Sequence, residues 1–281
     1  MNEPKNKPKT RQLNIELNID APIEAVWKAL TDAEELTRWF PLEAGTNPDG
    51  TIWMSWRDEF RSTSRVEISQ PPHHLRTVEV DVKISGEQPT EKISSANPLE
   101  MEPTATDFYL EAAGGKTVLR LVHSGFSADA EWDEWYDATQ RGWDFQLWSL
   151  KNYLEHHRGR QRHVAYVRTP IKKLSREEVW QRLFGTQMLI SKEKFENLKS
   201  GDRYSFQTAA GDHFEGVVHA FNPPHNFSGT VENLNHGLLE LHMYMLFDHP
   251  ELNFQFSTYE VPKEQMEAIE SRMRQLLEQL N

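Results

Sequence analysis

Aromatic side chains that could line a ligand site are concentrated in the first half of this 281-residue chain. Binding sites for small molecules are concave and mostly apolar, with a few polar groups that fix the ligand's orientation. Large aromatic side chains also dominate ordinary protein cores, so simple packing is the alternative explanation for each of them. Trp53, Trp56 and Trp143 are the better candidates for a ligand site. Eight of the nine tryptophans precede residue 160: Trp27, Trp39, Trp53, Trp56, Trp132, Trp135, Trp143 and Trp148.

The first half of the chain also contains one histidine that could contact a ligand. His123 ends an apolar strand pattern and is followed directly by Ser124-Gly125-Phe126. An imidazole there could offer a hydrogen bond at the mouth of a cavity, or act as a general base. The alternative is a histidine that is simply hydrogen-bonded at the end of a strand.

Other kinds of reactive site find no support in the residues. The chain has no cysteine, which excludes disulfides and thiolate chemistry. Its twelve histidines form no His-Glu-x-x-His pattern, so we expect no metal site. There is no glycine-rich phosphate loop, so we expect no cofactor, and no residue is singled out as catalytic. The carboxylates between Asp129 and Asp137 fit the start of a helix, where negative charge is favourable.

The charge and hydropathy of the chain restrict its partners and its location. A net charge of −12 argues against nucleic-acid binding, which depends on neutralising phosphates. No stretch approaches the roughly 20 apolar residues that span a bilayer. The polar N-terminus, Met1 to Gln12, has no apolar core of a secretory signal. We therefore expect a cytoplasmic protein with no membrane span.

Two motifs occur twice, and both recur at nearly the same offset. Glu24 to Leu30 returns as Glu177 to Leu183, and Pro71-Pro72-His73 returns as Pro223-Pro224-His225. An offset of about 150 residues is far longer than a solenoid repeat and corresponds to a duplicated domain. The sequence therefore predicts two domains, residues 1–158 and 159–281.

Both halves predict the same order of elements: a strand, short helices, a run of antiparallel strands and a closing helix. Leu13 to Ile19 alternates strictly, as a strand with one buried face does. The clearest later alternation is Val78 to Ile84, which also predicts a strand. Apolar residues at spacings of three and four predict a helix from about Ala130 to His157. Ser85 to Pro103 predicts a long polar excursion between strands.

The first half resembles a known family. Ala21 to Asp32 is similar to the opening of START-like (SRPBCC) domains, and more closely to the branch named for the activator of the heat-shock chaperone ATPase. Further similar pieces are Trp39-Phe40, the turn at 71–75, the strand and His-Ser-Gly-Phe motif at 115–126, and Gly142-Trp143 in the closing helix. The second half shares only the two repeated motifs and the general order of elements.

The resemblance implies an α+β fold of the helix-grip type. In this fold a curved antiparallel sheet wraps around a long C-terminal helix, and here the fold is duplicated. Members of the superfamily bind lipids, sterols and polyketides, some are enzymes, and some bind chaperones. A fold with so many uses does not by itself determine the function.

The leading hypothesis is non-catalytic binding of a small apolar, aromatic or lipid-like ligand between the sheet and the closing helix of the first domain. The second domain is then a divergent copy used for packing or as a partner surface. One alternative is a chaperone-binding module, by analogy with the ATPase activators. A second is a cyclase or dehydratase, which needs an acid or base inside the cavity. The expected ligand contacts are Trp53, Trp56, Phe108, His123 and Trp143.

Overall fold

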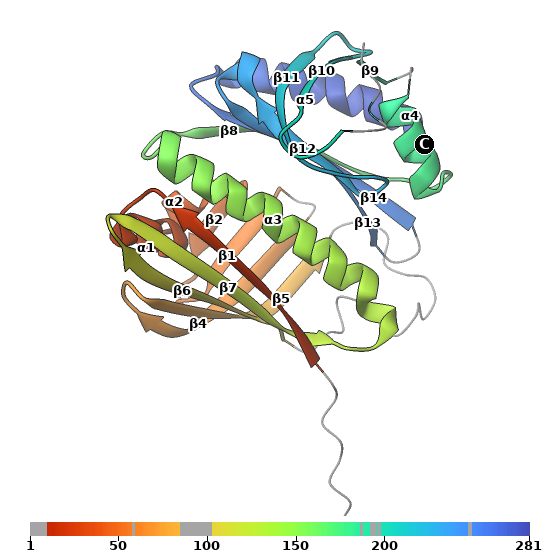
Figure 1. The fold of residues 1–281 in the computed structure, drawn as a ribbon. Helices are drawn as coiled ribbons and strands as arrows, with labels where there is room; N and C mark the ends of the chain where they lie inside the picture. The colour runs from red at the N-terminus through yellow and green to blue at the C-terminus, as the bar shows by residue number, and fades with distance from the viewer. Residues whose placement is uncertain are drawn as a thin grey trace, which may run out of the picture. The chain divides into compact units, whose positions relative to one another are not determined.

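The computed structural model describes residues 10–57, 60–84, 103–185, 188–191, 195, 198–246 and 249–281. It divides into two compact units, Met1–Gly159 and Arg160–Asn281. Each unit is an antiparallel seven-stranded sheet with helices (Figure 1). The polar excursion expected at 85–103 lies, apart from its last residue, outside the described residues.

The first unit is a meander whose first strand closes on its last. Its strand order is β1-β7-β6-β5-β4-β3-β2. The strands are β1 (Thr10–Ile19), β2 (Glu43–Thr46), β3 (Ile52–Trp56), β4 (Phe60–Gln70), β5 (His74–Ile84), β6 (Ala105–Ala113) and β7 (Lys116–Ser127). The helices are α1 (Ile23–Thr31), α2 (Ala33–Leu36), the 3-10 turn η2 (Ala130–Trp132) and α3 (Asp133–His156).

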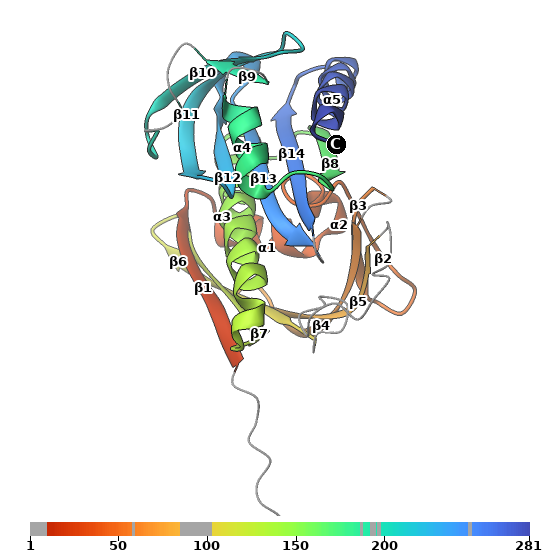
Figure 2. The ribbon, with the colours of Figure 1, turned by 90° about the vertical axis from the view of Figure 1, so that its right-hand side faces the viewer.

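Helix α3 lies along the concave side of this sheet (Figures 1 and 2). Its 24 residues make it roughly 36 Å long, enough to cross several strands. Two acidic residues, Asp133 and Glu134, occupy its first turn and suit the positive end of the helix dipole. The helix continues without a break through Gly142. A Cβ at this position would meet nothing within 4 Å, so the glycine is not required for another segment to pack closely against the helix.

The second unit repeats this plan. Its strand order is β8-β14-β13-β12-β11-β10-β9. The strands are β8 (Arg162–Pro170), β9 (Leu189–Ser191), β10 (Arg203–Thr208), β11 (His213–Asn222), β12 (Asn226–Val231), β13 (Gly237–Leu246) and β14 (His249–Tyr259). The helices are α4 (Arg176–Phe184) and α5 (Lys263–Leu277), with 3-10 turns η4 (Glu232–Leu234) and η5 (Glu278–Leu280).

The repeated motifs occupy equivalent places in the two units. The Pro71-Pro72 turn joins β4 to β5, and the Pro223-Pro224 turn joins β11 to β12; both peptide bonds are cis. In each unit the backbone carbonyl of the histidine that follows the two prolines accepts a hydrogen bond from a later strand. The donor is the amide of Leu110 in β6 for His73, and the amide of Met243 in β13 for His225. This confirms a duplicated α+β helix-grip fold.

Local signals predicted most elements, and the two shortest edge strands were missed. Helix α4 begins with a capping box, in which the hydroxyl of Ser175 accepts from the amide of Glu178 and the carboxylate of Glu178 accepts from the amide of Ser175. Strands β2 and β9 were not expected. They have four and three residues, too few for alternation to be visible in the sequence.

Candidate ligand-binding face

The inner face of the first unit, meaning the sheet face turned toward α3, can be traced from ring contacts and strand register. Phe108 of β6 meets Trp143 of α3 with ring centroids 6.0 Å apart, in a T-shaped arrangement. His123 of β7 meets the same tryptophan, also at 6.0 Å. Three of the five expected contact residues are therefore neighbours, although the chain separates Phe108 from Trp143 by 35 positions.

His123 and Trp143 are also joined by a hydrogen bond. The indole Nε1–H of Trp143 donates to Nδ1 of His123 at 2.9 Å. Indole nitrogen can only donate, so Nδ1 must carry a lone pair, and the proton of the neutral ring must sit on Nε2. Burial favours this neutral form, because it lowers the pKa of His123 to about 4. His123 therefore has an Nε2–H group to offer as a hydrogen-bond donor.

This tautomer limits the chemistry open to His123. A general base must have a free lone pair aimed at the proton it removes. Nδ1 is occupied by the indole, and Nε2 carries the proton. In this arrangement the imidazole can donate to an acceptor oxygen of a ligand, and the general-base role considered from the sequence is not available to it.

Further aromatic rings extend the inner face toward the far end of the sheet. Phe40, just after α2, lies 5.5 Å from the ring of Trp143 and 5.2 Å from that of Trp56. Trp56 in turn meets Phe60 of β4 at 5.4 Å. Phe40 and Phe60 were not among the expected contacts. Phe40 could have been predicted as a contact from its position just after a short helix. No local sequence pattern marks Phe60 as a contact.

We call Phe40, Trp56, Phe60, Phe108 and Trp143 the aromatic cluster. All of its members except Phe108 retain partial solvent exposure, although they lie among apolar neighbours. His123 is likewise only partly buried. Aromatic side chains bury 150–250 Å² each in an ordinary core, so partly exposed rings on an inner face still have area to offer a ligand.

Trp53 is not brought together with these residues. It lies three positions from Trp56 on β3, and successive side chains of a strand point to opposite faces. Its ring covers Gly45 of β2 and stacks beneath the guanidinium of the exposed Arg61, 4.5 Å away. Trp53 therefore belongs to the outer face of the sheet.

Glu79 of β5 lies on the inner face and was missed from the sequence. The register of β5 against β4 shifts beside it, so that Ser64 pairs with Glu79 and Thr63 with Asp81, and Val80 is the extra residue of a β-bulge. Val80 is consequently exposed, at 44%. Burial raises the pKa of Glu79 to about 7, and among the described residues its carboxylate makes no hydrogen bond or ion pair.

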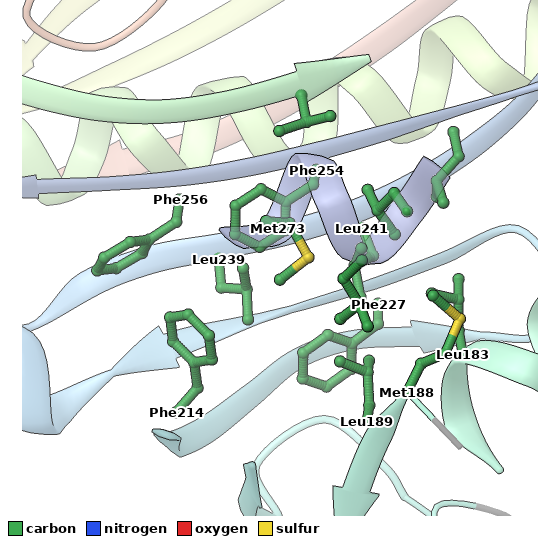
Figure 3. Close-up of a cluster of buried hydrophobic side chains, with 14 of the residues drawn as sticks. Leu183, Met188, Leu189, Phe214, Phe227, Leu239, Leu241, Phe254, Phe256 and Met273 are labelled. Carbon is green, nitrogen blue, oxygen red and sulfur yellow. The ribbon is translucent and has the colours of Figure 1, made fainter. Parts of the chain in front are cut away.

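The inner face of the second unit differs in being closely packed (Figure 3). At the margin of this core Phe195 is 7% exposed, and Phe184 and Phe221 are partly buried. Five further phenylalanines pack in the same cluster as Met273 of α5, and none of the five is more than 2% exposed. These phenylalanines are Phe206, Phe214, Phe227, Phe254 and Phe256. Rings with no accessible area have none to give to a ligand, so the first unit is the better candidate for binding.

Acid should weaken the fold of the first unit through His123. Unfolded histidine binds a proton near pH 6.5, whereas His123 in the folded protein resists protonation until about pH 4. The unfolded state therefore gains a proton first as pH falls, and we expect a loss of up to about 3 kcal/mol between pH 6.5 and 4. Urea titrations at several pH values measure this loss.

The matched control for that experiment is His123→Gln. Glu79 acts in the opposite sense, because its raised pKa makes the folded state the better proton acceptor. The contribution of His123 is therefore the difference between the wild type and the variant. A His123 ring resonance that titrates near pH 6.5 in the folded protein would contradict the prediction.

Most of the first unit matches the model of a known protein family. Residues 20–155 match the family model described as "Activator of Hsp90 ATPase homolog 1-like protein". This confirms the resemblance carried by Ala21 to Asp32 and the later motifs. None of the curated proteins is similar enough in sequence to count as a match.

Several solved structures are similar to the chain at low identity. Protein MLL2253 from Mesorhizobium loti is 19% identical, over 53% of this chain and 99% of that one, with a TM-score of 0.42. The Aha1 dimer from Colwellia psychrerythraea is 21% identical, over 53% and 99%, with a TM-score of 0.39. The di-domain ARO/CYC BexL from the BE-7585A biosynthetic pathway is 14% identical, over 96% and 94%, with a TM-score of 0.42.

The described residues hold neither a candidate metal site nor a helix suited to a membrane. No group of three or more histidine or acidic side chains there is arranged to hold a metal ion. Within the same residues, no helix has the length and apolar character needed to cross a membrane.

Proposed function

Starting from residues 20–155 as a domain of the activator of Hsp90 ATPase homolog 1-like family, we propose that this protein binds a small apolar or aromatic ligand on the inner face of its first unit. The observation that carries the proposal is the His123–Trp143 pair within the aromatic cluster. It combines one oriented hydrogen-bond donor with several rings that keep exposed area. Apolar walls with few polar groups are the usual composition of a small-molecule site.

In this proposal the rings and the imidazole have separate tasks. The aromatic cluster supplies apolar area and edge-to-face contacts, which stabilise a bound ring by burial and by about 0.5–1.5 kcal/mol for each well-placed pair. His123 donates from Nε2 to an acceptor oxygen of the ligand. A ligand without that oxygen would leave a buried N–H unpaired, which costs about 1–3 kcal/mol. The proposed ligand is therefore a flat apolar molecule with an oxygen acceptor.

We expect 2-acetylnaphthalene, a neutral aromatic ketone, to bind to the whole protein, and Trp56→Ala to weaken that binding roughly tenfold, or about 1.4 kcal/mol. Trp53→Ala is the matched control, because it removes the same side chain from the outer face of the same strand. We expect it to change affinity less than about twofold, or about 0.4 kcal/mol. Isothermal titration calorimetry measures both variants.

The two variants also show how the proposal would fail. Equal effects of Trp56→Ala and Trp53→Ala would mean that the inner face is not the binding surface. No binding of any neutral aromatic probe to the wild type would remove the proposed function itself.

An enzyme of the cyclase or dehydratase type is the second candidate. It requires an acid or a base among the inner residues, and Glu79, with a pKa near 7, is such a group. The chaperone-binding alternative rests on the family's name alone. It would gain support if the purified protein stimulated the ATPase activity of an Hsp90-type chaperone.

A further inference from the structure

We propose that Glu79 makes this face selective for ligands that carry a protonated amine, with the amine beside Glu79 and the apolar part against the aromatic cluster. The inference rests on the proposed function and adds the chemical class of the ligand. Three features support it: the direction of the side chain, the absence of a cation paired with it among the described residues, and its spacing from His123.

Register places Glu79 on the inner face. Thr77 pairs with Thr106, and Thr106 is two residues from Phe108, whose ring meets Trp143. Residues two apart share a face of a strand, so Thr77 and Glu79 lie on the same side of the sheet as Phe108. The bulge at Val80 follows Glu79 and does not alter this relation.

The cations of the neighbouring strands are engaged elsewhere. Each of the four on β4 and β5 has a partner among the described residues: Arg61 with Trp53, Arg65 with Glu67, Arg76 with Glu67 and Asp107, and Lys83 with Asp81. On α3, Arg141 lies 3.8 Å from Glu134. The inner-face neighbours of Glu79 on β4 and β5, Ser64 and Thr77, are uncharged.

A carboxylate in this position favours a cationic ligand for two physical reasons. Its raised pKa reflects desolvation without a compensating positive charge, and a bound ammonium group would supply that charge. The rings of Trp56 and Phe60, on the same face of the sheet, present π faces, which attract cations as well as apolar surface. A neutral ligand of the same shape would gain from the rings but not from Glu79.

The sheet also indicates the size of the ligand. His123 pairs with Thr106, and Thr106 with Thr77, so His123 and Glu79 are two strands apart and offset by two residues. Strand spacing and rise put their Cα atoms about 12 Å apart. If both side chains point toward a shared ligand, the distance between the imidazole of His123 and the carboxylate of Glu79 is shorter than the distance between their Cα atoms. A fused-ring molecule with an amine at one end and an oxygen acceptor near the other fits this separation.

The test compares two probes of nearly equal shape at pH 8, both with a methoxy oxygen that can accept from His123: 6-methoxy-2-naphthylmethylamine, which is protonated, and 6-methoxy-2-naphthalenemethanol, an alcohol that is neutral. We expect the wild type to bind the amine at least tenfold more tightly. Glu79→Gln should remove that preference and leave affinity for the alcohol unchanged. Asp81→Asn is the matched control, because it neutralises an exposed carboxylate two residues away on the same strand. It should keep the preference for the amine.

Each outcome has a distinct meaning. Equal binding of both probes to the wild type, or an amine preference that survives Glu79→Gln, would overturn the inference and leave the proposed function intact. An amine preference lost equally in Asp81→Asn would mean that general surface charge is responsible, which also overturns it. If neither probe binds, the proposed function fails, and this inference fails with it.

Discussion

Replacing Trp143 with alanine is expected to weaken binding of 2-acetylnaphthalene by at least tenfold, the largest effect of any single change on the inner face. The substitution removes a ring that meets Phe40, Phe108 and His123. It also removes the N–H donor that keeps Nδ1 of His123 deprotonated. Without that donor the imidazole can adopt either tautomer, so the direction of its own donor is no longer fixed. Calorimetry measures the affinity.

Trp143→Phe separates the two contributions of the indole. Phenylalanine keeps much of the apolar area but has no donor, so we expect a smaller loss of affinity than for alanine. Nitrogen chemical shifts of the His123 ring should show proton on Nε2 in the wild type and a mixture of tautomers in Trp143→Phe. If Trp143→Ala folds normally and binds the ketone with unchanged affinity, then Trp143 has been assigned the wrong role.

Replacing Phe254 with alanine is expected to have the largest effect on stability. Its ring is fully buried in the core of the second unit, where its centroid lies 6.5 Å from that of Phe214. Removal of a buried phenylalanine typically costs 3–5 kcal/mol, through lost burial and the cavity that remains. We expect the second unit to lose about that much free energy of unfolding, while affinity for the ketone at the first unit stays unchanged.

Phe60→Ala provides the reciprocal comparison. Phe60 is a partly exposed ring of the aromatic cluster, so its loss should cost less stability and more affinity than that of Phe254. Fluorine NMR of 5-fluorotryptophan protein, unfolded with urea, can follow the two units separately, because Trp180 is the one tryptophan in the second unit. Comparable losses of ligand affinity in both variants would contradict the division of roles between the units.

The sequence alone was sufficient for features that depend on local interactions. Alternation and helical spacing predicted most strands and helices, because these patterns reflect backbone geometry within a few residues. The recurrence of Pro-Pro-His and of the helix at Glu24 and Glu177 predicted the duplication, and the equivalent turns confirm it. Alternation also places Trp53 and Trp56, three positions apart, on opposite faces of the strand, so the expectation that both contact one ligand conflicts with strand geometry.

Tertiary structure decided which of these side chains meet. The hydrogen bond from Trp143 to His123 depends on how α3 lies over β7, which no local pattern encodes. Glu79 shows the same dependence within one strand. Its segment alternates regularly in the sequence, yet the bulge at Val80 exposes a valine and leaves the carboxylate inside. Bulges and helix placement result from packing between distant segments, so the chemistry of this face became visible only in the folded chain.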